Sequence, residues 1–342
     1  MRTTLKVLVV YNPTAGGGRA GRLAPRVVER LRGDGVEVAQ HPTRSLEDAR
    51  LAACLAAAEV DVVVAVGGDG TVGACAAGLA DAGPAGGSGG PPGWSPGGSG
   101  GSGGPPGWSP GGSGGSGGPG VRAALGVVPA GGGNDAARSL GLPADDPLAA
   151  AGLLTRLRRR PADLATVAGR AYLNVAGAGF DSEVNRVANQ RLGWARGRPR
   201  YVGAVLAQLV VGRTARFELV LDGRAQRLEG WLVAVANGPS YGGGMRVAPR
   251  ASLADGLLDV VVIGAIGKLE FLRTFPKVFS GAHVEHPAVA VHRAARVDLD
   301  ADRSLAVYAD GEPAGTLPAT FEVRPSAVTV LAADPAPGFP GP

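Results

Sequence analysis

Short apolar runs alternate with helical hydrophobic spacing over the first 81 residues of the chain. The runs are continuous, as expected of strands buried on both faces of a parallel sheet, and they lie at residues 5–11, 36–39 and 60–66. Apolar positions recur every three or four residues in the segments between and after them, which predicts helices at residues 20–32, 46–58 and 72–81. This alternation predicts a parallel sheet covered by helices, and a further strand at residues 124–129 continues it.

The pattern changes in the second half of the chain. Asp146 and Pro147 begin a helix that is predicted to end at residues 156–160, with Asp163 in the turn that follows it. Short runs then alternate with turn residues, and Asp222-Gly223 is a strong hairpin signal. Strands are expected at residues 164–168, 171–176, 217–221, 228–236, 258–263, 288–291, 296–299, 305–309, 320–323 and 328–331. The predicted fold is an α/β N-terminal domain with a parallel sheet, followed by an all-β, antiparallel, sandwich-type domain.

A glycine-rich turn joins the third expected strand to the third expected helix. Its sequence is Gly67-Gly68-Asp69-Gly70-Thr71. Glycine lets the backbone approach an anion closely, and the N–H groups of the following helix point at that anion. Asp69 adds a carboxylate suited to a magnesium-bound phosphate. Taken alone, such a turn favours a tight strand-to-helix connection with a capping Asp or Thr, and further segments of the chain change that interpretation.

Other glycine-rich segments follow a similar arrangement elsewhere in the chain. They are Tyr11-Asn12-Pro13-Thr14-Ala15-Gly16-Gly17-Gly18, Pro129-Ala130-Gly131-Gly132-Gly133-Asn134-Asp135 and Asn237-Gly238-Pro239-Ser240-Tyr241-Gly242-Gly243-Gly244, and Asp310-Gly311-Glu312 lies near the end. In order and spacing these motifs resemble the diacylglycerol kinase catalytic-domain superfamily, which includes sphingosine and ceramide kinases and bacterial YegS-like lipid kinases. The resemblance extends from about residue 6 to about residue 331.

The resemblance implies an ATP- and Mg²⁺-dependent lipid kinase. Diacylglycerol is the default acceptor, while sphingoid bases, ceramide and phosphatidylglycerol stay open. Glu312 would act as the base on the lipid hydroxyl, and Asp69 would act at the metal-bound phosphates. Nucleotide contacts are implied for Asn12, Gly67, Gly68, Gly70, Thr71, Gly131, Gly133 and Asn134. Asp163 and Asp255 are metal candidates by resemblance, although both are equally good turn aspartates.

One position departs from the family pattern. Gly132 stands where lipid kinases of this family usually have threonine, so one hydroxyl that would contact the nucleotide is missing. Backbone N–H groups can still bind phosphate, and we therefore expect weakened rather than abolished ATP binding.

The motifs and an insertion set the expected domains. A nucleotide-binding domain is expected over residues 1–163, completed by the C-terminal segment 317–332, with a β-sandwich lipid-substrate domain at 164–316 and a flexible tail at 333–342. Residues 82–120 interrupt the first domain with two identical Gly/Pro/Ser-rich copies. That composition predicts a disordered insertion, and docking through Trp94 and Trp108 is the alternative.

Composition bears on compartment and partners. The net charge is +5, which suits anionic lipid, ATP or nucleic acid, or reflects general arginine enrichment. We predict peripheral membrane contact and no nucleic-acid partner, and we leave a homodimer open. Two stretches combine basic and aromatic residues as at a membrane interface, residues 186–200 and 268–279. The absence of a spanning apolar run and the two cysteines predict a cytoplasmic protein. His283 and His286 are predicted to be solvated loop residues.

Two other functions fit parts of the sequence. An NAD kinase shares the Gly-Gly-Asp-Gly-Thr turn, but the Asn-Glu pair typical of that enzyme soon after it is not found, nor does that enzyme have the 237–244 pattern. A degenerate nucleotide- or lipid-binding regulator is favoured by Gly132 and opposed by the presence of Asp69 and Glu312. A P-loop NTPase is excluded because no G-x-x-x-x-G-K-[ST] motif occurs, and the protein-kinase signatures are absent as well.

Overall fold

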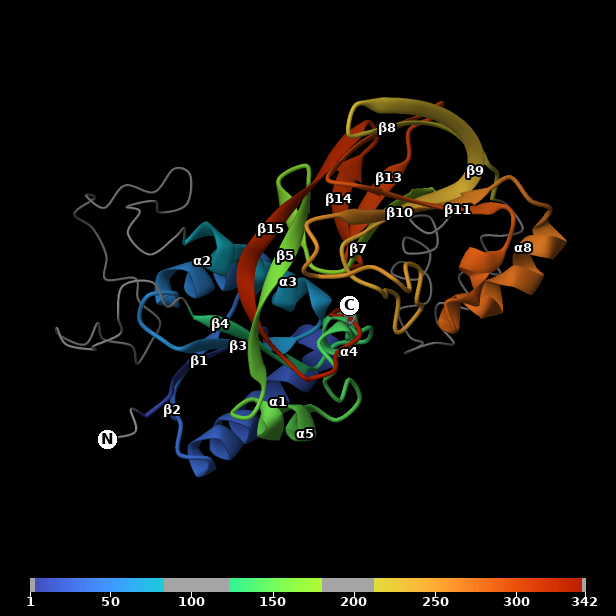
Figure 1. Cartoon of the computed structure of the whole chain (residues 1–342). Helices are drawn as coiled ribbons and strands as arrows, with labels where there is room; N and C mark the ends of the chain where they lie inside the picture. Colours follow the sequence, from blue (N-terminus) through green and yellow to red (C-terminus); the bar gives the residue numbers. More distant parts are fainter. Residues whose placement is uncertain (1–3, 83–122, 180–211, 340–342) are drawn as a thin grey trace, which may run out of the picture. The chain divides into compact units, whose positions relative to one another are not determined.

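The computed structural model describes residues 4–82, 123–179 and 212–339 (Figure 1). Its chain divides into two compact units. The first unit contains Met1–Ala137, Leu142–Ala162 and Ala327–Asp334, and the second contains Arg138–Gly141, Asp163–Ser326 and Pro335–Pro342. Most of the repeat insertion, with Trp94 and Trp108, and the arginine-rich stretch 186–200 lie outside the described residues.

The first unit is built on a parallel sheet with the strand order β4-β3-β1-β2. The strands are β1 (Lys6–Tyr11), β2 (Glu37–Pro42), β3 (Val62–Gly67) and β4 (Ala124–Pro129). Every position of β3 and β4 is buried, because α1 (Ala15–Gly33) and α5 (Pro147–Leu153) pack on one face and α2 (Leu46–Ala56) and α3 (Asp69–Asp81) on the other (Figure 1). The end of β15 (Ala319–Ala332) adds a fifth parallel strand through Val330 and Leu125.

The second unit is antiparallel. Its strands are β5 (Arg158–Val167), β6 (Arg170–Tyr172), β7 (Val175–Gly179), β8 (Ala215–Leu221), β9 (Arg224–Ala236), β10 (Leu258–Gly264), β11 (Val289–Ala294), β12 (Arg296–Ala301), β13 (Ala306–Ala309), β14 (Glu312–Thr316) and the start of β15. They pair in the order β14-β13-β7-β9-β8-β12-β15, and β10 pairs with β9 and β11. Inward side chains such as Phe217, Leu219 and Phe321 fill the core between the strands.

Helix caps and hairpin turns explain why the elements begin and end where they do. Ser45 Oγ accepts a hydrogen bond from Asp48 N at 3.0 Å, and Asp146 Oδ1 accepts from Leu148 N and Ala149 N at the start of α5. The predicted Asp222-Gly223 hairpin is present between β8 and β9. Both of its residues have positive φ, 46° and 85°, as a type I′ turn requires.

The structure of residues 154–167 shows that one predicted helix end is wrong. The helix expected to end at residues 156–160 ends at Leu153, and β5 already begins at Arg158. Pro161 accounts for the extended backbone at Arg160, because proline keeps the residue before it out of the helical region. Asp163 is therefore inside a strand and not in a helix-to-strand turn.

The C-terminal strands correct a second prediction. The strands expected at residues 320–323 and 328–331 are one continuous strand, β15, in which Ser326 has a φ of 49°. Strand β14 was not predicted. It contains Pro313 and Gly315, which argue against a strand in sequence, and it lies at the end of the strand order, where a missing N–H is tolerated.

The two histidines also differ from expectation. His283 is 2% exposed, and its Nε2 lies 3.0 Å from the carbonyl oxygen of Val247, so it is a core residue of the 3₁₀ helix Ala282–Glu285. Burial lowers the pKa of His283, while the contact with the Val247 carbonyl opposes that shift. His286 Nε2 lies 3.2 Å from Glu270 Oε1. His283 is therefore not a solvated loop residue, and His286 lies in a bend as expected but has a side chain only 16% exposed.

Candidate active site

Three glycine turns lie together at one edge of the first unit's sheet. They follow β1, β3 and β4, which are adjacent and parallel, so their carboxyl ends share that edge. Ala130 N donates to Gly67 O at 2.8 Å. A Cβ atom on Gly131 would lie 2.5 Å from Gly68 Cα, and one on Gly16 would lie 2.3 Å from Ala130 O. The three turns can therefore approach this closely only as glycine backbone.

The first turn is a left-handed segment, residues 16–18, that interrupts the start of α1. Gly16, Gly17 and Gly18 have φ angles of 60°, 67° and 80°, a region that side-chain-bearing residues rarely enter. Asn12 begins the loop, since its Oδ1 accepts hydrogen bonds from Thr14 N at 3.0 Å and from Thr14 Oγ1 at 2.8 Å. The predicted Asn12 side chain thus shapes the loop that would face a ligand.

Asp69 joins the second turn to the third. It is the first residue of α3, and its Oδ1 accepts a hydrogen bond from Ala136 N at 2.8 Å, in the first turn of α4 (Asp135–Ser139). In the third turn Asn134 Oδ1 accepts from Gly131 N at 2.9 Å, and Asn134 Nδ2 donates to Ala144 O at 2.9 Å. Asp69 and Asn134 therefore stabilise the backbone of the second and third turns through their side chains.

This edge has the chemistry of an anion site. The N-terminus of the 13-residue α3 carries a partial positive charge and begins at Gly68 with no side-chain cap. Thr71 is buried against Gly67, where an added Cβ would lie 2.6 Å from Thr71 Oγ1. A phosphate chain is the ligand that several glycine N–H groups and a helix N-terminus fit best.

The sequence motifs do not identify one residue of this edge. Thr43 follows β2, is buried, and its backbone N donates to Tyr11 O at 2.8 Å, directly before Asn12. No glycine cluster marks it. Only the position after the second parallel strand could have indicated it.

Glu312 and Asp310 have different surroundings in the second unit. Asp310 and Gly311 form a type I′ turn with φ angles of 47° and 82°, and Glu312 is the first residue of β14. The Asp310 carboxylate accepts hydrogen bonds from Leu173 N at 2.8 Å, Asn174 N at 3.1 Å and Val175 N at 3.0 Å. Among the described residues, the half-buried Glu312 carboxylate has no such partner. The Asp310 carboxylate therefore stabilises the backbone of residues 173–175, whereas the Glu312 carboxylate makes no such bonds within the described structure and could accept a proton from a ligand.

Other predicted motif residues form a buried polar network. Asn237 Nδ2 donates to Asp163 O at 3.0 Å and to Leu173 O at 2.7 Å, and Asn237 N donates to Asn174 O at 2.7 Å. The Asp163 carboxylate accepts from Gly256 N and Ser326 N, both at 2.7 Å. These bonds satisfy backbone groups inside the unit, so the network is architectural.

Protein groups contact the carboxylates of both metal candidates, Asp163 and Asp255. The Asp255 carboxylate forms an ion pair with Arg293 and also accepts from Leu257 N at 3.1 Å. Arg293 Nε is 3.9 Å from Asp259 Oδ1 as well, so a guanidinium supplies the positive charge beside both carboxylates. Burial raises the pKa of Asp259 to about 6, against the opposing charge of Arg293. No cluster of three metal-ligating side chains occurs in the described parts of the chain.

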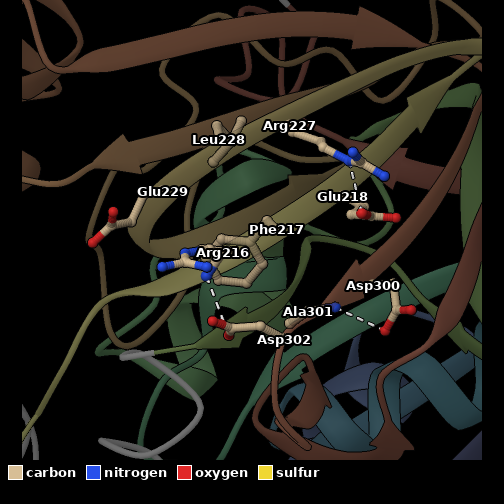
Figure 2. A pocket seen from close by; sticks show the side chains of 9 residues that line it. All are labelled: Arg216, Phe217, Glu218, Arg227, Leu228, Glu229, Asp300, Ala301 and Asp302. Atoms are coloured by element: carbon tan, nitrogen blue, oxygen red, sulfur yellow. Dashed lines mark hydrogen bonds and ion pairs between the residues drawn. The ribbon is translucent and has the colours of Figure 1, made fainter.

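A separate groove of about 720 Å³ lies on β8, β9 and β12 (Figure 2). Its rim is charged, and Arg227 Nε lies 2.7 Å from Glu218 Oε1 in an exposed ion pair that adds little stability. The buried Phe217 is among the residues that line it. None of the predicted site residues lines this groove, and it is not part of the candidate active site.

Comparisons with known proteins agree with this arrangement. Residues 6–167 match the diacylglycerol kinase catalytic domain, and residues 174–332 match the YegS C-terminal NAD kinase beta sandwich-like domain. A diacylglycerol kinase of Mycobacterium tuberculosis (strain CDC 1551 / Oshkosh) is 35% identical over 95% of this chain and 94% of its own length. One from Bacillus subtilis (strain 168) is 29% identical over 92% and 91%.

A solved structure extends the comparison to the fold. The crystal structure of a Bacillus anthracis (strain Sterne) protein assigned as a diacylglycerol kinase superimposes with a TM-score of 0.73 at 25% identity, covering 98% of both chains. The predicted fold class and the predicted family resemblance are confirmed.

Proposed function

We propose that this chain, which belongs to the diacylglycerol kinase family, transfers the γ-phosphate of ATP to the free hydroxyl of diacylglycerol and so makes phosphatidic acid. The observation that carries the proposal is the contact between the glycine turns after β1, β3 and β4, where Gly16 lies against Ala130 and Gly68 against Gly131. Such a glycine-lined edge suits the triphosphate of a nucleotide.

The proposed roles follow from the local geometry. The glycine turns and the N-terminus of α3 bind the phosphates, and Asn12 and Asn134 keep the turns in shape. Magnesium arrives as part of the MgATP substrate, and Asp69 lies at the edge where that ion would be carried. Glu312 accepts the proton of the lipid hydroxyl as that oxygen attacks phosphorus. A carboxylate without a competing partner suits this role.

One experiment tests the proposal directly. The purified protein is incubated with γ-labelled ATP, Mg²⁺ and a panel of acceptors: diacylglycerol, sphingosine, ceramide, phosphatidylglycerol and NAD. We expect label in phosphatidic acid, to a greater extent than in any other product. Label in another lipid would correct the acceptor, label in NADP would replace the function, and no label in any product would contradict the kinase proposal.

Membrane binding is expected to be peripheral and salt-sensitive. No helix in the described ranges is long and apolar enough to cross a bilayer, while the net charge of the chain is +5. Co-sedimentation with vesicles should therefore rise with the fraction of anionic lipid and fall as salt screens the charge. Binding that is indifferent to both variables would contradict this prediction.

Gly132→Thr is expected to lower the KM for ATP several-fold. A Cβ at Gly132 would meet no atom within 4 Å, and Gly132 is not among the positive-φ glycines, so threonine fits without strain. The added hydroxyl is worth about 1 kcal/mol if it bonds the nucleotide.

Gly132→Val is the matched control, because valine has the same shape without the hydroxyl. If both variants change the KM alike, the effect comes from bulk or loop stiffness and not from a hydrogen bond. Gly131→Ala should instead weaken ATP binding strongly, since its Cβ would meet Gly68 Cα.

A further inference from the structure

Helix α8 (Lys268–Thr274) exposes two large apolar side chains. Leu269 is 60% exposed and Leu272 is 38% exposed, and Leu269 is the most exposed large apolar residue in the described part of the chain. The two are three positions apart, so they share one face of the helix. Figure 1 shows α8 beside β11 at the rim of its unit.

The opposite side of α8 is fixed to the sheet. Phe271 is 4% exposed, and its ring centroid lies 5.3 Å from that of Trp231 and 6.5 Å from that of Phe275. Trp231 Nε1 also donates to Ile266 O at 2.9 Å, directly before the helix. Because this aromatic side anchors the helix, the two leucines are held outward.

Basic side chains surround the leucines. Lys268, Arg273 and Lys277 are all exposed on α8 and the 3₁₀ helix Phe275–Phe279. The one acid of α8, Glu270, has its Oε1 3.2 Å from His286 Nε2, so three cations face one carboxylate on this segment. Exposed Arg246 belongs to the same surface, since its backbone N donates to Val278 O at 2.9 Å. We call Leu269, Leu272, Lys268, Arg273 and Lys277 the α8 face.

We propose that the α8 face docks onto a bilayer that carries anionic headgroups. The leucines would enter the headgroup region, and the cations would bind lipid phosphates. The proposal rests on the proposed function, because its acceptor lipid resides in a membrane. Two leucines ringed by cations are a small apolar area for a stable protein interface, whereas they suffice for an interfacial helix that also uses charge.

Vesicle binding by designed variants tests the proposal. The vesicles are phosphatidylcholine with or without phosphatidylglycerol. L269S/L272S should weaken binding to the anionic vesicles about tenfold or more. Replacing Lys268, Arg273 and Lys277 with glutamine should weaken it about fivefold for each cation removed. The matched control is L51S/L55S, because Leu51 and Leu55 are 40% and 41% exposed on α2. The control should bind like the wild type.

Activity separates this proposal from the proposed function. Short-chain diacylglycerol dispersed as monomers needs no membrane, so L269S/L272S should keep wild-type kcat on it and lose activity on long-chain diacylglycerol in vesicles. Absence of phosphorylation with both substrates in the wild type would overturn the proposed function, while vesicle binding still reports on the α8 face. Wild-type vesicle binding by L269S/L272S, or equal loss in the control, would overturn the docking proposal. A changed oligomeric state with unchanged vesicle binding would do so too, and would indicate a protein interface.

Discussion

Glu312→Gln is expected to slow lipid phosphorylation by about 100- to 10,000-fold while MgATP binding stays near the wild-type value. Glutamine keeps the size and the polar oxygen of glutamate but cannot accept the proton that the acceptor hydroxyl loses. Glu312 begins β14, after the Asp310-Gly311 turn, and is half-buried with no partner in the described structure. The measurement is a nucleotide titration together with single-turnover phosphorylation of the best lipid.

Two further variants make this result specific. Glu322→Gln changes an exposed strand glutamate of the same unit, paired with Arg296, and should leave the rate unchanged. Asp310→Asn should lower the free energy of unfolding by about 2 kcal/mol, because its carboxylate accepts three charge-assisted bonds from residues 173–175. If Glu312→Gln keeps near-wild-type turnover, and Asp310→Asn loses turnover at unchanged stability, then Asp310 is the base.

The Asp222-Gly223 turn shows why Asp310 is better understood as structural. Both turns have an aspartate and a glycine with positive φ, and in both the carboxylate binds backbone N–H groups of a neighbouring segment. Asp222 accepts from Ala295 and Arg296. The two hairpins differ in the next residue, which is Arg224 in one and Glu312 in the other. The aspartate stabilises the hairpin in both cases, and Glu312 is the feature that distinguishes the second hairpin.

Local patterns predicted most of the first unit. The β4 strand was placed at the residues that the structure assigns to it, because a continuous apolar run bounded by glycine has few alternatives. The turns after β1, β3 and β4 were also identified. Their close approach was not, because it depends on the order β4-β3-β1, which local periodicity does not contain. A Cβ atom on Gly131 would lie 2.5 Å from Gly68 Cα, and this steric restriction arises only because the strand order brings Gly68 beside Gly131.

The second unit was predicted less completely, since its polar motif residues act over long sequence distances. Asp163 binds the backbone of Gly256 and Ser326, and no pattern around residue 163 indicates either partner. Asp255 is a metal candidate by resemblance, and the structure places Arg293, from β11, against the carboxylate of this turn residue. His283 is predicted to be a loop residue but is buried through the packing of its 3₁₀ helix. Tertiary contacts decided each of these cases.

Asp69→Asn is expected to weaken MgATP binding by about 10- to 100-fold, the typical value of a charge-assisted contact, and to lower turnover as well. Asp69 has two separable roles, one in the structure of the turn and one in the proposed binding of MgATP. Its Oδ1 accepts from Ala136 N at 2.8 Å, which holds α4 against the second glycine turn, and its charge lies at the edge proposed for the metal-bound phosphates. Asparagine keeps an oxygen for Ala136 and loses the charge, so its melting temperature should match the wild type.

Asp69→Ala separates the two roles of Asp69. Alanine loses both the charge and the hydrogen bond, so this variant should also lose about 1 kcal/mol of stability, the usual cost of an unmet helix N-terminus. Both variants are measured by calorimetric nucleotide titration with and without Mg²⁺ and by thermal melting. If Asp69→Asn binds MgATP normally, the carboxylate is only a cap for α4. If Mg²⁺-free ATP loses as much affinity as MgATP, Asp69 acts on the fold of the turn and not on the metal-bound phosphates.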